Sequence, residues 1–256
     1  MSERSELLAN NENSLDLKKK IFQLLPGFLR KLIRKNYYFK KFRETSLQDE
    51  KDLQLIPMLI RPGDTVLDIG ANYGLYTRFF AQQVGETGTV HSFEPVPDTF
   101  DVLKNNIEKS GLLQVKVHNL AISNQSGSAT ISVPTYPDGS ENYYEATLQH
   151  TERGKGILIQ TIRLDDWLDS FSQLHFIKLD VEGHEPPALE GMKLLIEKYH
   201  PIFLIEINDD FSPGSIGNQV KQMMSDWGYF MYFFEKHELR PSSGKENGVN
   251  YVFIYK

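Results

Sequence analysis

The sequence predicts an α/β fold built on a mostly parallel β-sheet with helices on both faces. From residue 65 onward, short apolar runs alternate with longer amphipathic runs, as strands alternate with helices in such folds. The first apolar run leads into a glycine turn, and the second ends in an acidic residue, Glu94. The chain has 256 residues, of which 40% are hydrophobic, and this suits one large domain with an appendage.

The alternation predicts seven strands and four helices. Runs rich in Val, Ile and aromatic residues predict the strands, and the 3.6-residue period predicts the helices. We expect strands at residues 65–70, 88–95, 113–123, 175–183, 200–208, 229–234 and 250–256. We expect helices at residues 74–85, 97–111, 185–199 and 216–228.

One segment, at about residues 126–161, breaks this rhythm and predicts an inserted β-hairpin. Two strand-like runs enclose a long loop that is rich in tyrosine. Long loops in compact domains are often functional. We therefore expect Tyr143 and Tyr144 to stack on a substrate, although tyrosine is equally common in packing.

Charge divides the chain into two parts. Residues 1–47 predict a disordered start and a basic amphipathic helical arm, and residues 48–256 predict the α/β domain. Residues 18–43 carry ten Lys or Arg and no acid, yet the whole chain has a net charge of −6. The arm is expected to pack on the acidic body, and peripheral membrane contact through residues 18–43 is the alternative. The acidic body argues against a nucleic-acid partner, and the absence of cysteine predicts a reducing, cytoplasmic location.

The turn after the first strand predicts a cofactor site. In "VLDIGANYG", Asp68 stands where a dinucleotide-binding loop has its first glycine, and Gly70 and Gly74 allow a tight turn. A fixed negative charge is unfavourable beside a pyrophosphate but favourable beside a cation. S-adenosylmethionine fits, because it carries a sulfonium and an ammonium but no phosphate. Glu94, at the end of the second strand, can accept hydrogen bonds from ribose hydroxyls.

The stretch "IKLDVEGHE" places ionisable residues at alternate positions where a buried strand ends. In an extended chain, Lys178, Asp180, Glu182 and His184 would share one face. Because ligands bind at the carboxyl ends of strands in open α/β sheets, this face is predicted to line a reaction site. Glu206 and Asn208 alternate in the same way at the end of the next strand, and we expect them to contact substrate.

Together, "VLDIGANYGLYTRFFA", "HSFEPVPDTFDVLKNNI", "LAIS", "IRLDDWL" and "IKLDVEGHEPPALEGM" resemble the FkbM-type S-adenosylmethionine-dependent methyltransferases. The resemblance covers residues 65–207. It implies a Rossmann-like class I methyltransferase fold, with a seven-stranded sheet whose last strand is antiparallel. It also implies methyl transfer to an oxygen, often a hydroxyl of a sugar or a natural product.

The resemblance also implies roles for individual residues. The predicted cofactor-binding residues are Asp68, Gly70, Ala71, Asn72, Tyr73, Gly74, Glu94, Pro95, Ala121 and Asp180. Within this set, Glu94 would hold the ribose and Ala121 would lie near the adenine.

His184 is expected to be the general base, because its ordinary pKa lies near neutrality. Asp180 and Glu182 complete the expected catalytic group. A divalent metal on Asp180, Glu182 and His184 is possible in principle, but the spacing does not indicate one.

Two other functions stay open at this point. A nucleotide-dependent oxidoreductase is disfavoured by Asp68. A non-catalytic cofactor-binding module, acting at membranes or on partners through the basic arm, is disfavoured by the retained ionisable residues 178–184. The acceptor and the oligomeric state are not predicted.

Overall fold

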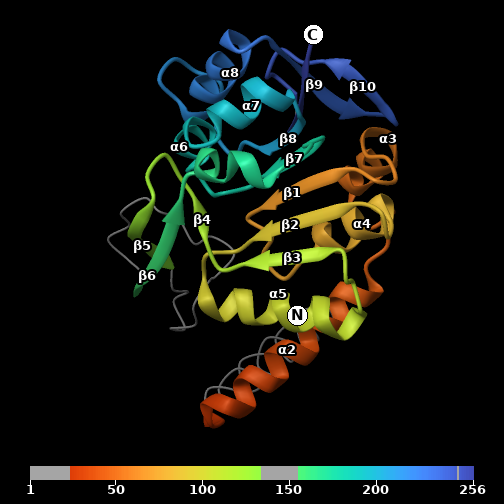
Figure 1. Cartoon of the computed structure of the whole chain (residues 1–256), viewed down its shortest axis with the longest axis vertical. Helices are drawn as coiled ribbons and strands as arrows, with labels where there is room; N and C mark the ends of the chain where they lie inside the picture. Colours follow the sequence, from red (N-terminus) through yellow and green to blue (C-terminus); the bar gives the residue numbers. More distant parts are fainter. Residues whose placement is uncertain (1–23, 134–154, 247) are drawn as a thin grey trace, which may run out of the picture.

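The computed structural model describes residues 24–133, 155–246 and 248–256. The strands of its central sheet are β1 (Thr65–Ile69), β2 (Thr89–Phe93), β3 (Val115–His118), β7 (Phe176–Leu179), β8 (Ile202–Glu206), β9 (Tyr229–Glu235), β10 (Glu238–Pro241) and β11 (Asn250–Tyr255). Their order is β10-β9-β11-β8-β7-β1-β2-β3 (Figure 1). Neighbouring strands from β3 to β8 are parallel, whereas β11 is antiparallel to both of its neighbours. The predicted α/β fold with an antiparallel last strand is therefore confirmed.

The predicted number of seven strands was wrong, because the described part of the sheet has eight. The additional strand, β10, forms an antiparallel hairpin with β9. Its two turn residues, Lys236 and His237, both have positive φ, at 51° and 63°. Such turns usually contain Asn-Gly or a similar pair, and the sequence lacks that signal here.

Two predicted elements are each divided in the structure. The strand expected at 113–123 ends at His118, and Ala121–Ile122 (β4) joins a second sheet. The helix expected at 185–199 is interrupted at Gly191, giving α6 (Glu185–Glu190) and α7 (Lys193–Tyr199). A Cβ on Gly191 would lie 1.9 Å from the carbonyl oxygen of Ser123, so the chain after β4 packs directly against this interruption.

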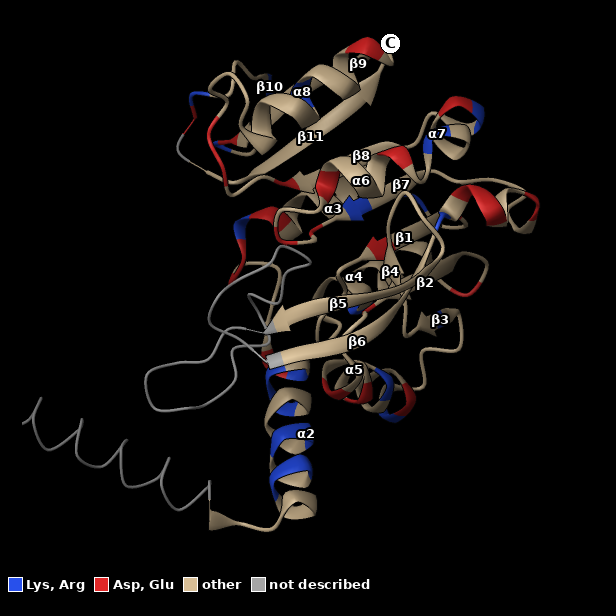
Figure 2. Cartoon of the chain, turned by 90° about the vertical axis from the view of Figure 1, so that its left-hand side faces the viewer, with Lys and Arg blue, Asp and Glu red and all other residues tan. Residues whose placement is uncertain are grey.

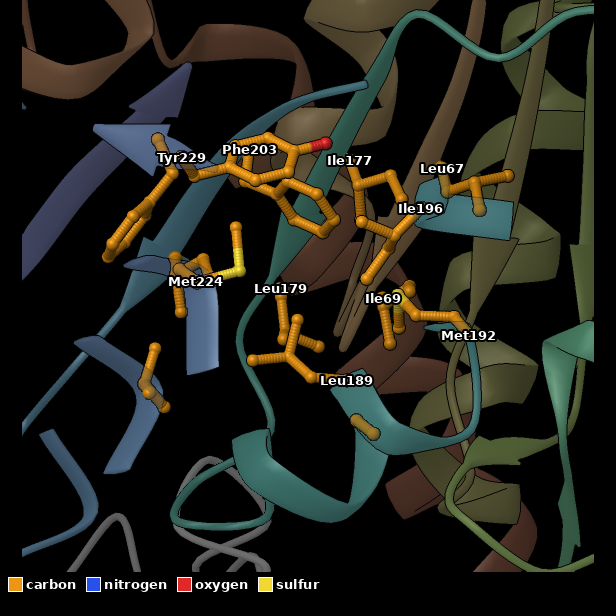
Figure 3. Close-up of a cluster of buried hydrophobic side chains, with 14 of the residues drawn as sticks. Leu67, Ile69, Ile177, Leu179, Leu189, Met192, Ile196, Phe203, Met224 and Tyr229 are labelled. Atoms are coloured by element: carbon orange, nitrogen blue, oxygen red, sulfur yellow. The ribbon is translucent and has the colours of Figure 1, made fainter. Parts of the chain in front are cut away.

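Helices cover both faces of the large sheet. The helices α2 (Gly27–Glu44), α3 (Ile56–Leu59), α4 (Leu75–Val84) and α5 (Pro97–Ser110) lie on one face, and α6, α7 and α8 (Ile216–Asp226) lie on the other. Alternate strand residues serve the two cores, since Val66 packs with the first group and Leu67 with the second. Figure 3 shows the second core, in which Leu67, Ile177 and Phe203 meet helix residues.

A smaller sheet lies beside the carboxyl ends of β1, β2 and β3 (Figure 1). It has the order β4-β6-β5, and β5 (Gly127–Val133) and β6 (Lys155–Ile162) form the predicted hairpin. Its apolar cluster includes Ala121, Ile131 and Ile159. Tyr143 and Tyr144 lie outside the described residues.

The end of the basic arm is part of the core. The side chain of Phe42, near the end of α2, is 0% exposed within the cluster that contains α4 and α5. The ring of Tyr38 lies 5.2 Å from that of Tyr73, and the guanidinium of Arg78 donates to the carbonyl of Arg43. The hydrophobic core therefore begins inside the segment expected to be an arm.

We predict that Phe42→Ala lowers the free energy of unfolding by roughly 3–5 kcal/mol, because it removes a fully buried aromatic ring and leaves a cavity. Urea unfolding monitored by circular dichroism measures this. The matched control is Phe28→Ala on the same helix, where the ring is 71% exposed, and it should change stability by less than about 0.5 kcal/mol. Equal effects of the two substitutions would contradict the packing described for α2.

Candidate active site

A cavity of about 270 Å³ opens at the carboxyl ends of β1, β2, β7 and β8. This is the edge at which open α/β sheets bind ligands. The cavity brings together the turn after β1, the end of β2, the segment after β7 and the small sheet. Its lining residues are Ile69, Gly70, Asn72, Phe93, Glu94, Pro95, Val96, Leu120, Ala121, Ile122, Ile131, Asp180, Val181, Glu182, His184 and Glu206.

Most of the predicted site residues meet in this cavity. Those that line it are Gly70, Asn72, Glu94, Pro95, Ala121, Asp180, Glu182, His184 and Glu206. The side-chain amide of Asn208 donates hydrogen bonds to two of the lining carboxyl groups, those of Glu182 and Glu206. Asp68, Ala71, Tyr73 and Gly74 do not line it.

Gly70 makes the closest backbone approach in the site. Its φ is 83°, in the region that favours glycine, and a Cβ there would lie 1.7 Å from the carbonyl oxygen of Asp180. The N–H groups of Gly70 and Ala71 both donate to the carbonyl of Phe93, at 3.0 and 2.9 Å. The turn is therefore held between the ends of β2 and β7, and a side chain at position 70 does not fit.

Asp68 lies beneath this turn. Its carboxyl group is fully buried, and Oδ2 accepts a hydrogen bond from the hydroxyl of Thr77, which also lies 3.1 Å from Ser92 Oγ. Oδ1 has no hydrogen-bond partner among the described residues. Burial raises the pKa of Asp68, and the ammonium of Lys178 opposes that effect. The residue supports the turn and places a buried, incompletely satisfied oxygen under it.

Glu94 joins the turn to the end of β2. One carboxyl oxygen accepts the N–H of Asn72 at 3.0 Å, and the other accepts the N–H of Val96 at 2.9 Å. Burial raises the pKa of Glu94 to about 7, although these two hydrogen bonds lower it. Because a carboxylate oxygen can accept two hydrogen bonds, Glu94 retains capacity for hydroxyl groups in the cavity.

Two residues of the glycine loop serve packing. The ring of Tyr73 contacts Tyr38 of α2, and its carbonyl accepts a hydrogen bond from Asn106 of α5 at 2.9 Å. Gly74 has a φ of 90°, and a Cβ there would lie 2.7 Å from Leu103. Both residues thus position α4 and α5 around the turn.

The four ionisable residues from Lys178 to His184 do not lie on one extended segment, although the last three line the same cavity. The alternation holds only while the chain is extended, and β7 ends at Leu179. Glu182 and Gly183 have φ values of 48° and 89°, so the chain turns before His184. Lys178 is 3% exposed and does not line the cavity, whereas Asp180, Glu182 and His184 do.

Lys178 and Asp180 form a partly buried ion pair. Lys178 Nζ lies 2.7 Å from Asp180 Oδ2 and 4.6 Å from the centre of the Tyr76 ring. Burial acts to lower the pKa of Lys178, but the carboxylates of Asp180 and Asp68 outweigh it and raise the pKa. Lys178 is therefore held as a cation, paired with the carboxyl group of Asp180.

Glu206, at the end of β8, lies across the cavity from the glycine turn. Asn208 Nδ2 donates to Glu206 Oε1 at 3.2 Å and to Glu182 Oε2 at 3.5 Å. Burial and the neighbouring carboxylate of Asp180 raise the pKa of Glu206 to about 7. Glu206 is therefore a carboxyl group of the cavity that takes a proton more readily than an ordinary glutamate does.

His184 lies at the start of α6 and lines the cavity. Its Nε2 lies 2.9 Å from Ser123 Oγ, and burial lowers its pKa below the ordinary value of 6.5. The neutral imidazole can accept a proton at neutral pH. If Nε2 donates its hydrogen to Ser123, Nδ1 is the nitrogen that accepts.

Ser123 and the apolar lining were not predicted as site residues. Ser123 could have been found, because it follows Ala121 by two positions in a short strand and so shares its face. Val96, Leu120, Ile122 and Ile131 carry no local signal, since apolar residues in strands and turns are equally typical of a core.

The described residues contain no cluster of three or more His, Asp or Glu side chains arranged to hold a metal ion. The carboxyl groups beside Asp180 are instead balanced by Lys178.

The strand order and the site together define the class of the protein. The order β3-β2-β1-β7-β8-β11-β9 with β11 antiparallel, the glycine turn after β1 and an acid after β2 define a class I methyltransferase fold. A family profile described as "Methyltransferase FkbM domain" matches residues 68–231. The chain belongs to the FkbM methyltransferase family.

Several proteins that are similar to this chain in sequence are methyltransferases. The chain is 29% identical over 161 residues to the 31-O-demethyl-FK506 methyltransferase FkbM of Streptomyces tacrolimicus, covering 52% of this chain and 61% of that protein. It is 26% identical over 178 residues to the hexuronic acid methyltransferase AglP of Haloferax volcanii, covering 68% and 69%. It is also 26% identical over 164 residues to the 2-O-methyltransferase NoeI of Sinorhizobium fredii, covering 59% and 66%. The chain thus spans less than two thirds of the first of these relatives.

Solved structures include a similar chain, the methyltransferase FkbM from Methylobacillus flagellatus KT. It is 15% identical with a TM-score of 0.48, and the match covers 96% of this chain and 60% of that one. The fold assignment rests on the strand order and the family match.

The raised pKa of Glu206 predicts a pH-dependent stability. A group whose pKa rises from 4.5 to about 7 on folding stabilises the folded state below pH 4.5, and this contribution is lost as pH rises through 7. Glu206→Gln removes the titration. The melting temperature of the variant minus that of the natural chain should therefore become more positive as the pH rises from about 4.5 to about 8.

Thermal unfolding at a series of pH values measures this difference. Asn208→Ala is the matched control, because it removes the amide bonded to Glu206 without removing a titrating group. It should not reproduce the pH-dependent gain of Glu206→Gln. A difference between Glu206→Gln and the natural chain that is constant with pH would show that Glu206 does not titrate in this range.

Proposed function

We propose that this chain transfers a methyl group from S-adenosylmethionine to a hydroxyl oxygen of a small acceptor, such as a sugar or a natural product. The observation that carries the proposal is one cavity whose two sides are formed by different strands and carry different residues. Gly70, Asn72 and Glu94 lie on the side formed by β1 and β2, and Asp180, His184 and Glu206 lie on the side formed by β7 and β8. The names of the relatives support oxygen as the acceptor atom, since two of them specify O-methylation.

The residues present fit this cofactor. Glu94 retains lone pairs for ribose hydroxyls, and Leu120, Ala121 and Ile122 offer an apolar surface for adenine. The buried carboxyl of Asp68, with its unpartnered Oδ1, favours a cationic ligand at the turn. Bound in this way, the cofactor supplies an activated methyl group on a sulfonium.

The side chains after β7 and β8 would orient the acceptor and remove its proton. His184, neutral at physiological pH, would accept the hydroxyl proton, while Ser123 fixes the orientation of the imidazole. Asp180 and Glu206 would accept hydrogen bonds from hydroxyl groups of the acceptor. Glu182, which lines the cavity and accepts a hydrogen bond from Asn208, would position the outer part of the acceptor. The cytoplasmic location predicted from the sequence stays a prediction.

The first test concerns cofactor binding. Calorimetry should show that S-adenosylhomocysteine binds and that Glu94→Gln weakens binding by about 1–3 kcal/mol, the usual worth of a hydrogen bond to a charged group. Glu108→Gln, on the solvent side of α5, is the control and should bind normally. Binding of NAD without binding of S-adenosylhomocysteine would overturn the proposal in favour of an oxidoreductase.

The second test concerns the base. His184→Ala should lower the turnover of an acceptor found in a panel of glycosides by roughly 10²–10⁴, with little change in S-adenosylhomocysteine affinity. Because burial lowers the pKa of His184, the turnover rate of the natural chain should fall on the acid side only below pH 6.5. This acid limb of the pH–rate profile should disappear in the variant.

Ser123→Ala should lower turnover less than His184→Ala does, and it should shift the acid limb of the pH–rate profile to a different pH. Both effects are expected of a group that orients the base. Near-normal turnover of His184→Ala would assign proton removal to Glu206 or to water. The corresponding Glu206→Gln variant distinguishes these two cases.

A further inference from the structure

In its first half, helix α2 turns basic residues toward the body and exposes apolar residues, which is the reverse of an ordinary surface helix, whereas its second half packs on the body through Tyr38 and Phe42. Its basic side packs on the body: Lys31 Nζ lies 3.0 Å from Asp98 Oδ1, and Lys35 Nζ lies 4.0 Å from Asp101 Oδ2, both on α5. Arg34, on the same side, donates to the hydroxyl of Thr99 at 3.3 Å. In the usual arrangement, charged residues face water and apolar residues face the core.

The apolar residues of the same stretch face outward. Phe28 is 71% exposed, Leu32 is 53% exposed and Ile33 is 44% exposed. Phe28 and Leu32 are four positions apart and Ile33 follows Leu32, so the three side chains lie close together on the helix surface, whereas Leu29 is half-buried. We call Phe28, Leu32 and Ile33 the outer face of α2. Leu24, just before the helix, is 85% exposed as well.

The first half of α2 projects beyond the rest of the molecule. Figure 1 shows the helix running past α5 and away from the rest of the molecule, and Figure 2 shows basic residues along its length. Burial of its final turn through Phe42 fixes the direction of this projection. The outer face is therefore presented on a rigid helix, where a flat surface can reach it.

The charge of the helix indicates which kind of surface it fits. Between Gly27 and Glu44 there are seven Lys or Arg residues and one acid, Glu44, whereas the whole chain carries a net charge of −6. A second copy of α2 would bring two basic helices together, and their repulsion opposes that contact. A nucleic acid would use the charges but not the exposed apolar side chains. A bilayer with anionic headgroups uses both.

We propose that α2 docks this chain on a membrane surface rich in anionic phospholipids. The outer face enters the boundary between headgroups and acyl chains. Basic residues beside it, such as Arg30 and Lys40, reach the phosphates. The described helices include none that is both long and apolar enough to span a bilayer, so the contact proposed is a peripheral one. This inference does not depend on the chemistry of the cavity.

Flotation of the full chain with lipid vesicles tests the proposal. Vesicles of phosphatidylcholine with about 30% phosphatidylserine should carry the protein at low salt. Pure phosphatidylcholine, or about 0.5 M salt, should reduce the bound fraction at least tenfold, because screening removes the electrostatic part. The double substitution Phe28→Ser and Leu32→Ser should reduce it by a similar factor, and so should Arg30→Glu with Lys40→Glu.

The matched control is Leu113→Ser with Leu194→Ser, which removes two exposed leucines elsewhere on the surface, of which Leu113 is 95% exposed. It should float like the natural chain. Circular dichroism melting and S-adenosylhomocysteine calorimetry verify that each variant is folded. Failure of the natural chain to float, or flotation unaffected by both α2 variants, overturns the proposal. A dimer in sedimentation equilibrium that the Phe28→Ser and Leu32→Ser variant dissociates also overturns it, in favour of a second copy.

Discussion

The close contact between the ends of β1 and β7 is the constraint on which the site depends. Gly70 lies directly against the carbonyl oxygen of Asp180. A Cβ at position 70 would clash with that oxygen, so only glycine fits there. The N–H of Asp180 also donates to the carbonyl of Ile69 at 3.0 Å. These contacts join the half of the cavity formed by β1 and β2 to the half formed by β7 and β8. In the proposed function, a cofactor on one side and an acceptor on the other would therefore be held in a fixed relation, which is what in-line group transfer requires.

Electrostatic balance is the second constraint. Burial raises the pKa of four carboxyl groups, those of Asp52, Asp68, Glu94 and Glu206. The buried ammonium of Lys178, which is paired with Asp180, lowers the pKa of Asp52, Asp68 and Glu206 against this effect. Replacing it would leave buried negative charge without compensation, which is among the most destabilising changes a protein can undergo. Lys178 thus serves the stability of the fold and the ionisation of the site together.

The small sheet and the arm extend the domain in two directions. The small sheet contributes Ala121, Ile122 and Ile131 to the cavity and places Ser123 beside His184. The arm contributes Phe42 to the core, and its first half, which projects from the body, exposes Phe28, Leu32 and Ile33. The same chain therefore has an enclosed, mixed polar and apolar site on one part of its surface and a basic, amphipathic helix on another. The pairing of basic residues of α2 with acids of α5 orients the helix and leaves its apolar side uncovered by any described residue.

The sequence by itself determined the fold class, the glycine turn and the family. Those features depend on local periodicity and on short motifs, such as Asp68 to Gly74 and Ile177 to Glu185, whose residue types carry their own physical reason. The tertiary structure decided which residues meet in the cavity. Tyr73 turned toward α2, and Ser123 reached His184 across 61 positions of the chain. It also decided which side of α2 faces the body. The hydrophobic pattern alone predicts the apolar side, but the acids that pair with its basic side lie on a helix more than 60 residues away. Such long-range contacts depend on how the strands pair and how the helices pack, which no local pattern encodes.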